Sequence, residues 1–126
     1  MTDDAGIGVD VVQVSRLRDA VGRWGDRFVE RLFTAAELCA TRRGQGFRWP
    51  SLAGRFAAKE AAKKVFAARG HAADWNEIEV VTGGGGEPLL RLHGRARRAA
   101  ELCGFETMQV SISHEREIAV AVVLAR

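Results

Sequence analysis

The segment from Ser51 to Gly70 constrains the fold most strongly. It contains no proline and is rich in alanine and charged side chains, so it is predicted to form one long helix. Residues that recur within it at three- and four-residue steps share one side of that helix; they are Phe56, Glu60, Lys63, Lys64 and Ala67. The alanines beside them allow other backbone or a ligand to approach closely. A carboxylate and an ammonium after an aromatic ring favour a metal-bridged phosphate over a plain solvated face.

The chain before this helix is predicted to contain a strand and two helices. Residues 7–12 are mostly β-branched, which is typical of a strand buried on both faces. The helical pattern that follows is expected to stop at Gly22. The spacing from Thr34 to Glu37 is that of a capping box, which opens a short helix. Residues 44–50 are expected to form a loop that ends where Pro50 starts the long helix.

The chain after the long helix is predicted to be mainly antiparallel. The glycines 83–86 and Pro88 form a turn whose backbone can lie against a ligand. The predicted elements are strands over 77–82, 89–92, 108–113 and 118–125, a helix over 94–103, and a turn over 114–117. We therefore expect an α+β fold, a single small domain over residues 1–126 with helices packed on a mainly antiparallel sheet.

Composition indicates a cytoplasmic globular protein. The chain has 126 residues, of which 47% are hydrophobic and 28% charged, and it lacks the run of roughly 18 apolar residues that a membrane helix needs. Met1 to Asp4 are acidic rather than typical of a signal peptide. Cys39 and Cys103 lack metal-binding spacing, so reduced thiols and the cytoplasm are expected.

The net charge of +3 comes from 19 Lys and Arg against 16 Asp and Glu. Basic clusters of this kind attract nucleic acid, a phosphorylated cofactor or an acidic protein. No helix-turn-helix, zinc or aromatic-platform signature accompanies the charge. Nucleic acid and membrane are therefore not expected as partners.

Two carboxylates leave a structural and a functional interpretation open. Asp10 stands inside an otherwise apolar strand, where an unpaired carboxylate costs on the order of several kcal/mol. A salt bridge, a position at the end of the strand, or a bound cation would each offset that free-energy cost. Glu60 can form a surface pair with Lys64 worth ~0.3–0.5 kcal/mol. Together, the two carboxylates also suit Mg²⁺, which uses one or two protein carboxylates together with waters and substrate phosphates.

Two predicted turns also allow either a structural or a functional interpretation. His114 is either a polar turn residue or a donor to a phosphate. The glycines 83–86 are either a flexible turn or a phosphate cradle, although no P-loop helix follows them.

Three segments in fixed order resemble the holo-acyl carrier protein synthase family, the small type of 4′-phosphopantetheinyl transferase. They are Gly6-Ile7-Gly8-Val9-Asp10, the stretch from Gly54 to Lys64, and Ser111-Ile112-Ser113-His114, with Gly86-Glu87-Pro88 as a weaker fourth element. The resemblance spans nearly the whole chain. Two departures are Glu87, where the family often has lysine, and Ile118, where an aromatic is common.

The resemblance implies a role for each matching residue. Asp10 and Glu60 would hold Mg²⁺ against the coenzyme A pyrophosphate, with Lys64 on a phosphate, and these three would form the catalytic set. Contacts to the 3′-phospho-ADP half would come from the residues Arg55, Gly85, Gly86, Pro88 and His114. Arg16 would dock the acidic carrier protein.

The implied reaction moves the 4′-phosphopantetheine arm from coenzyme A to a serine of an apo-acyl carrier protein and releases 3′,5′-ADP. The serine proton would pass to Glu60 or to a metal-held water, and the sequence does not separate these. The family's homotrimer, with sites between subunits, is implied by resemblance alone. A catalytically silent coenzyme A-binding or regulatory module is the alternative. The sequence does not identify the carrier's pathway among fatty-acid, polyketide and peptide synthesis.

Overall fold

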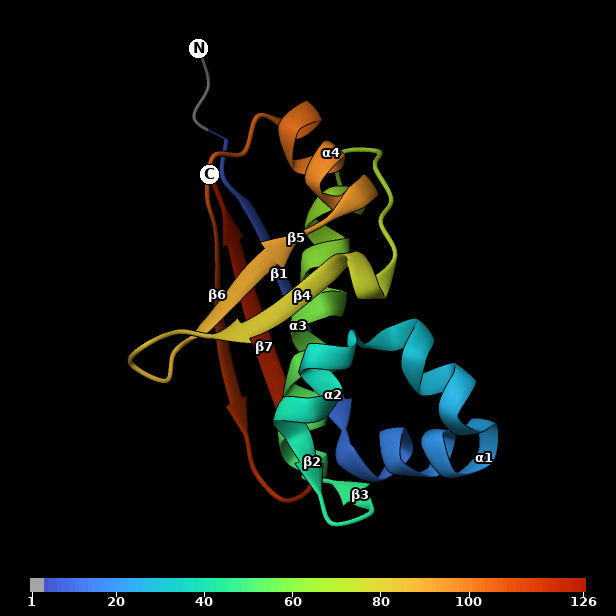
Figure 1. The fold of residues 1–126 in the computed structure, drawn as a ribbon. Helices are drawn as coiled ribbons and strands as arrows, with labels where there is room; N and C mark the ends of the chain where they lie inside the picture. The colour runs from blue at the N-terminus through green and yellow to red at the C-terminus, as the bar shows by residue number, and fades with distance from the viewer. Residues whose placement is uncertain (1–3) are drawn as a thin grey trace.

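The computed structural model describes residues 4–126 of the chain (Figure 1). In chain order the elements are β1 (Gly6–Gln13), α1 (Val14–Leu32), α2 (Ala35–Thr41), β2 (Arg42–Arg43), β3 (Gly46–Phe47), α3 (Trp49–Ala67), the 3₁₀ turn η1 (Trp75–Glu77), β4 (Ile78–Thr82), β5 (Pro88–Leu92), α4 (Gly94–Cys103), β6 (Met108–His114) and β7 (Ile118–Ala125). Residues 1–3, the first part of the N-terminus predicted not to be a signal peptide, lie outside the described residues.

The main sheet joins the two ends of the chain. Its order is β1-β7-β6, and both pairings are antiparallel. The β4–β5 hairpin and the short β2–β3 pair form separate two-stranded sheets. The α+β fold class with helices on antiparallel sheets is therefore confirmed, although the sheet includes the N-terminal strand as well as the late ones.

Helix α3 lies across the main sheet (Figure 1) and approaches it closely at two glycines. Near its start, a Cβ on Gly54 would lie 2.8 Å from Ile112 Cγ2 of β6. Two turns later, a Cβ on Gly8 of β1 would overlap the Ala61 carbonyl. Glycine at these two points lets α3 pass from the β6 edge to the β1 edge without being lifted off the sheet.

The two faces of the main sheet differ in what covers them. Gly8, Asp10 and Val12 of β1 are opposite Val123, Ala121 and Ala119 of β7, and those three β7 side chains are buried under α3. The alternate side chains face outward, and Ile7 is 72% exposed. The prediction of a strand buried on both faces is therefore wrong for the single chain, because β1 is an edge strand covered on one face only.

Several predicted boundaries also change. Helix α1 continues past Gly22 to Leu32, with non-helical backbone at Gly25 (φ 78°, ψ −161°). The predicted loop over 44–50 contains β3 and the first turn of α3, which itself ends at Ala67 rather than Gly70. The capping box at Thr34 and Glu37 is present.

The core is built mostly from small side chains on α3. Ala53, Ala57, Ala58, Ala61 and Ala62 are all fully buried. They pack against mostly small residues of β7 and α4 and against larger side chains from α1 and β4. In residues 4–126 no helix is both long and apolar enough to cross a membrane, and both cysteines are free.

Candidate active site

The first group of predicted site residues lies at the β1 edge. Lys64 Nζ is 3.1 Å from Asp10 Oδ1 and also donates to the Val9 carbonyl at 2.9 Å. The Asp10 side chain is 18% exposed and that of Lys64 is 58% exposed. Glu60 is half-buried one helical turn before Lys64. Asp10 is therefore a carboxylate at a sheet edge with a cation beside it, and Lys64 pairs with Asp10 instead of forming the Glu60 surface pair.

This edge fits a hard divalent cation held partly by substrate. Among residues 4–126, no three His, Cys, Asp or Glu side chains gather closely enough to hold a metal by themselves. Mg²⁺ does not need such a cage, because it keeps several waters and takes one or two carboxylates plus phosphate oxygens. Asp10 and Glu60 supply that donor chemistry, and Lys64 supplies a compact charge for a phosphate.

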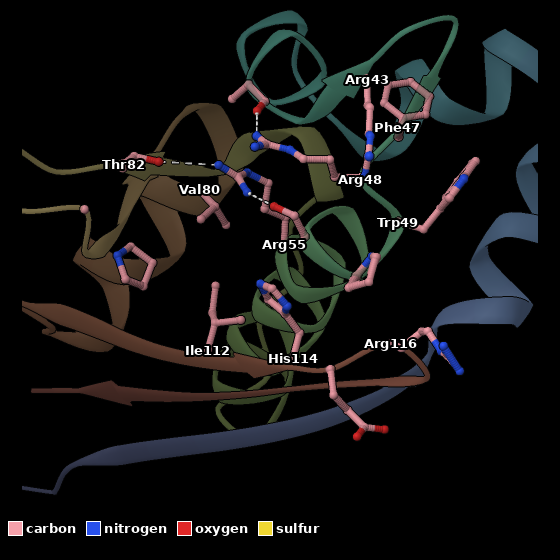
Figure 2. A pocket seen from close by; sticks show the side chains of 16 residues that line it. Arg43, Phe47, Arg48, Trp49, Arg55, Val80, Thr82, Ile112, His114 and Arg116 are labelled. Atoms are coloured by element: carbon pink, nitrogen blue, oxygen red, sulfur yellow. Dashed lines mark hydrogen bonds between the residues drawn. The ribbon is translucent and has the colours of Figure 1, made fainter.

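The second group lines a pocket of about 870 Å³ between α3, β6 and the β4–β5 hairpin (Figure 2). His114 and Ile112 of β6 form one side, and Arg55 of α3 and Thr82 of β4 form another. His114 is the last residue of β6 and not part of the turn. Four predicted contact residues, Arg55, Gly86, Pro88 and His114, therefore come together here.

Arg55 presents its guanidinium to this pocket. Its Nη1 donates to Ser51 Oγ at 2.9 Å and its Nη2 donates to Thr82 Oγ1 at 3.4 Å (Figure 2). Its Nε is buried and has no hydrogen-bond partner among the described residues. Burial lowers the pKa of Arg55 from its ordinary value, with Glu37 opposing the shift and Arg48 adding to it. A buried donor without a partner is suited to an anionic ligand such as a phosphate.

One backbone N–H of the glycine turn between β4 and β5 is already hydrogen-bonded within the turn. Gly86 and Pro88 line the pocket, whereas Gly85, the remaining predicted contact, does not. The Gly85 N–H donates instead to Glu87 Oε2 at 3.0 Å. This contact is the structural consequence of glutamate where the family often has lysine.

Arg16 is exposed near the start of α1, directly after β1. Other exposed arginines follow it along α1 and form a row in the sequence. Arg23 precedes the kink at Gly25, and Arg27 and Arg31 follow it. Trp24 is 63% exposed, and Trp24, Arg27, Phe28 and Arg31 line a shallow groove. The row and groove were not predicted, although the arginine spacing was visible in the sequence.

The pocket contains further residues that the sequence did not single out. Arg43, Arg48 and Arg116 bring positive charge to its rim, and Trp49 brings an aromatic side chain (Figure 2). Arg48 is held by a hydrogen bond to the Ala40 carbonyl. The cluster Arg42-Arg43 and the isolated Arg48 were a visible signal, but only the fold brings them opposite His114.

The two groups of site residues lie on opposite sides of α3. Asp10 pairs with Ala121, which pairs in turn with Ile112, so the β1 edge and the pocket are roughly 10 Å apart across the sheet. Ala57 and Ala58 of α3 pack on Ala121 between them. One protomer therefore does not bring its own Asp10 and Lys64 into the pocket that contains its own Arg55 and His114.

This chain belongs to the 4′-phosphopantetheinyl transferase superfamily, which it matches over residues 6–123. The fold is of the same class, and the chain carries a basic pocket on one side of α3 and a carboxylate–lysine pair at the β1 edge on the other.

More particularly, the chain is similar to holo-acyl-carrier-protein synthases. The synthase of Dehalococcoides mccartyi (strain CBDB1) is 40% identical over 119 residues, covering 94% of this chain and 96% of that protein. The Helicobacter pylori synthase in complex with coenzyme A has a TM-score of 0.80 and 26% identity, with 95% of this chain and 99% of that chain covered. The Neisseria meningitidis synthase has a TM-score of 0.82 and 28% identity, with 96% of this chain and 97% of that chain covered. The predicted resemblance and the predicted enzyme class, a phosphopantetheinyl transferase, are confirmed.

Proposed function

We propose that this protein transfers the 4′-phosphopantetheine arm of coenzyme A to a serine of an apo-acyl carrier protein, with Mg²⁺, and releases 3′,5′-ADP. The observation that carries the proposal is the contact of Asp10 with Lys64 at 3.1 Å in a chain of this superfamily. The Helicobacter pylori relative crystallised with coenzyme A supports the co-substrate. The free cysteines agree with the cytoplasm as the place of action.

Asp10 and Glu60 would hold Mg²⁺, which when bound supplies Lewis-acid charge neutralisation on the pyrophosphate. Lys64 would bind a phosphate oxygen as a point charge, and Arg55 would accommodate a second phosphate through its unpartnered Nε. His114, Gly86 and Pro88 would contact the nucleotide half, and Gly85 would do so once Glu87 releases its N–H. Catalysis by these residues is mainly positioning and charge stabilisation, and the serine proton would pass either to Glu60 or to a metal-held water.

The separation of the two groups supports a site shared between subunits. Coenzyme A bound to one protomer's Arg55 and His114 would reach the Asp10, Glu60 and Lys64 of a neighbouring copy. The outward face of the main sheet offers the contact surface, because most of its exposed side chains on β1 and β7 are apolar; they are Ile7, Val9, Val11, Ile118 and Val122. A contiguous group of exposed apolar side chains is typical of an interaction site. We therefore propose the homotrimer, with the neighbouring copies seated on this face.

Arg16 would dock an acidic helix of the carrier protein, because it is an exposed cation near the start of α1, shortly after the strand that carries Asp10. Arg16→Glu is expected to raise the apparent KM for carrier about tenfold and to leave the KM for coenzyme A unchanged, because only the protein partner meets that charge. Arg18→Glu is a matched control, since Arg18 is exposed on another side of α1. An unchanged carrier KM in the Arg16 variant would contradict the docking assignment.

The intact mass of several apo-carriers after incubation with the protein, coenzyme A and Mg²⁺ tests the reaction. The carrier mass is expected to rise by one phosphopantetheine arm, with stoichiometric 3′,5′-ADP, and to stay unchanged when Mg²⁺ is chelated. If coenzyme A binds but every carrier remains unmodified at saturation, the alternative of a silent coenzyme A-binding module is correct. The carriers that are modified fastest also identify the pathway.

A further inference from the structure

A fully buried ion pair lies directly beside the proposed catalytic residues. Lys59 Nζ is 2.6 Å from Glu37 Oε1, and both side chains have zero exposure. Lys59 also donates to the carbonyls of Trp75 at 3.0 Å and Ile78 at 2.7 Å. The three acceptors satisfy all three protons of the ammonium. Burial lowers the pKa of Lys59, and the charge and hydrogen bond of Glu37 oppose that shift.

Glu37 connects this ammonium to two other elements. Its Oε1 also accepts the Thr34 N–H at 2.9 Å, and its Oε2 accepts the Val80 N–H at 2.8 Å. The same residue therefore caps α2, binds the backbone of β4 and holds α3. The side chains of Lys59 and Glu37 thus form one connection, which we call the α3 clamp.

The stability of the fold alone does not explain why the chain has a buried ion pair at this place. Replacing a buried ion pair by apolar side chains of similar size is often neutral or stabilising, because both charges are desolvated. Most of the α3 face on the sheet is alanine and glycine, and Val65 is the larger side chain that packs on β1. The small side chains interlock little with the sheet, so that part of the face resists rotation of the helix about its axis only weakly. A directional, fully satisfied ion pair provides that resistance.

Rotation of α3 would displace the proposed catalytic groups. Glu60 is the next residue after Lys59, and Lys64 lies one turn beyond Glu60. A helix with side chains has a radius of roughly 5–6 Å, so a rotation of about 20° moves side-chain ends by about 2 Å. Misplacement of a reacting group by about 1 Å can lower the rate about 100-fold.

We propose that Lys59, through its bond to Glu37, is a positioning residue that sets the rotation of α3 and thereby orients Glu60 and Lys64 toward Asp10. The proposal rests on the function proposed above. Lys59 itself touches neither substrate nor metal, because it is sealed between α2, α3 and η1.

Lys59→Met tests the clamp, because it removes the charge and keeps most of the volume. In this variant kcat is expected to fall about 100-fold, and the Mg²⁺ concentration for half-maximal rate is expected to rise. Binding of 3′,5′-ADP, measured by calorimetry, should also weaken, because Arg55 lies on the same helix and the rotation would stretch its bond to Thr82 of β4. Phe66→Leu is the matched control: Phe66 is fully buried on the same helix and packs in a different cluster. It should lower the melting temperature and leave kcat within threefold.

A crystal structure of the Lys59→Met protein provides a readout that does not depend on activity. The expected result is a rotated α3 with Lys64 Nζ more than about 4 Å from Asp10, beyond ion-pair range. An α3 that superposes on the wild type would overturn the proposal, and so would equal kcat losses in the Lys59→Met and Phe66→Leu proteins. If Lys59→Met does not fold, Glu37→Gln weakens the same bond and is judged by the same measurements. An inactive wild type would instead contradict the proposed function, and the structure would still decide the clamp.

Discussion

Lys59 and Lys64 are near neighbours on α3, yet their surroundings differ completely. Lys59 is fully buried with three acceptors, whereas the Lys64 side chain is 58% exposed and pairs with Asp10. An exposed pair of this kind contributes at most about 1 kcal/mol to stability. The charge at the β1 edge is therefore available for a ligand, while the charge inside the helix packing is not.

Asp10→Asn separates the ligand role of this carboxylate from a structural one. The variant is expected to lose at least about 100-fold in transfer rate and less than about 1 kcal/mol in unfolding free energy, because its ion pair is exposed. Transfer assays across a range of Mg²⁺ and urea unfolding check the two values. Wild-type turnover with unchanged Mg²⁺ dependence would rule out the proposed metal role.

Glu79 makes the stability depend on pH. Its burial alone would raise the pKa, but hydrogen bonds from Thr34 and His93 and the positive charge of His93 and Arg91 outweigh burial, so the pKa lies below its ordinary value. A carboxylate with a depressed pKa in the folded state stabilises it above the unfolded pKa, and this contribution is lost as the pH falls through the folded pKa.

Glu79→Gln is therefore expected to lower the unfolding free energy by about 1–2 kcal/mol near neutral pH. The difference from wild type should shrink as the pH falls below about 4. Urea unfolding at several pH values measures it. The exposed Glu106→Gln is a control that should show no such change. A difference that persists at low pH would mean that Glu79 acts through packing rather than charge.

Helix α3 is the element that organises the site. It carries Arg55 at the pocket, Lys59 in the clamp, and Glu60 and Lys64 at the β1 edge. Its path across the sheet allows these residues, all within a few turns, to serve two different places. That path depends on close approach to β1 at Gly8.

Gly8→Ala tests the close approach, because the added Cβ would overlap the Ala61 carbonyl. Overpacking of backbone against backbone is expected to cost about 2–3 kcal/mol of unfolding free energy. Gly22→Ala is the matched control: Gly22 lies in α1 with nothing within 4 Å of the added Cβ. There alanine should stabilise the helix by roughly 0.5–1 kcal/mol. Urea unfolding of both variants distinguishes the close contact from a general effect of alanine.

The outer face of the main sheet exposes several apolar side chains of β1 and β7 in the part of the chain that the structure describes. Ile7 and Val9 are 72% and 53% exposed although β1 has a strongly apolar sequence. Side chains along β1 therefore alternate between a face covered by α3 and an uncovered face, and Asp10 lies on the covered face. Contact with neighbouring copies would bury this face and complete the two halves of the site.

Val9→Glu places a charge on this face and is expected to give a folded monomer with activity reduced at least about 100-fold. Light scattering at assay concentration reports the assembly, and circular dichroism reports the fold. Leu102→Glu is the matched control, since Leu102 is also exposed but lies on α4 away from the sheet. A fully active monomer, from wild type or variant, would contradict the shared site.

The sequence by itself determined what depends on neighbouring residues. The long helix, the capping box at Thr34 and Glu37 and the C-terminal hairpins follow from propensities and short spacings. The ordered motifs also identified the superfamily. These features are local or are matched residue by residue, so they need no knowledge of the packing.

Only the tertiary structure decided which distant residues meet. In the tertiary structure β1 pairs with β7, helix α1 continues past Gly22, and the outer side of β1 is exposed. The tertiary structure also joins Lys59 to Glu37 and places the site residues on two sides of α3. The physical reason is that these outcomes depend on close approach at Gly8 and Gly54 and on burial of charge, which are energies of packing between segments far apart in the chain.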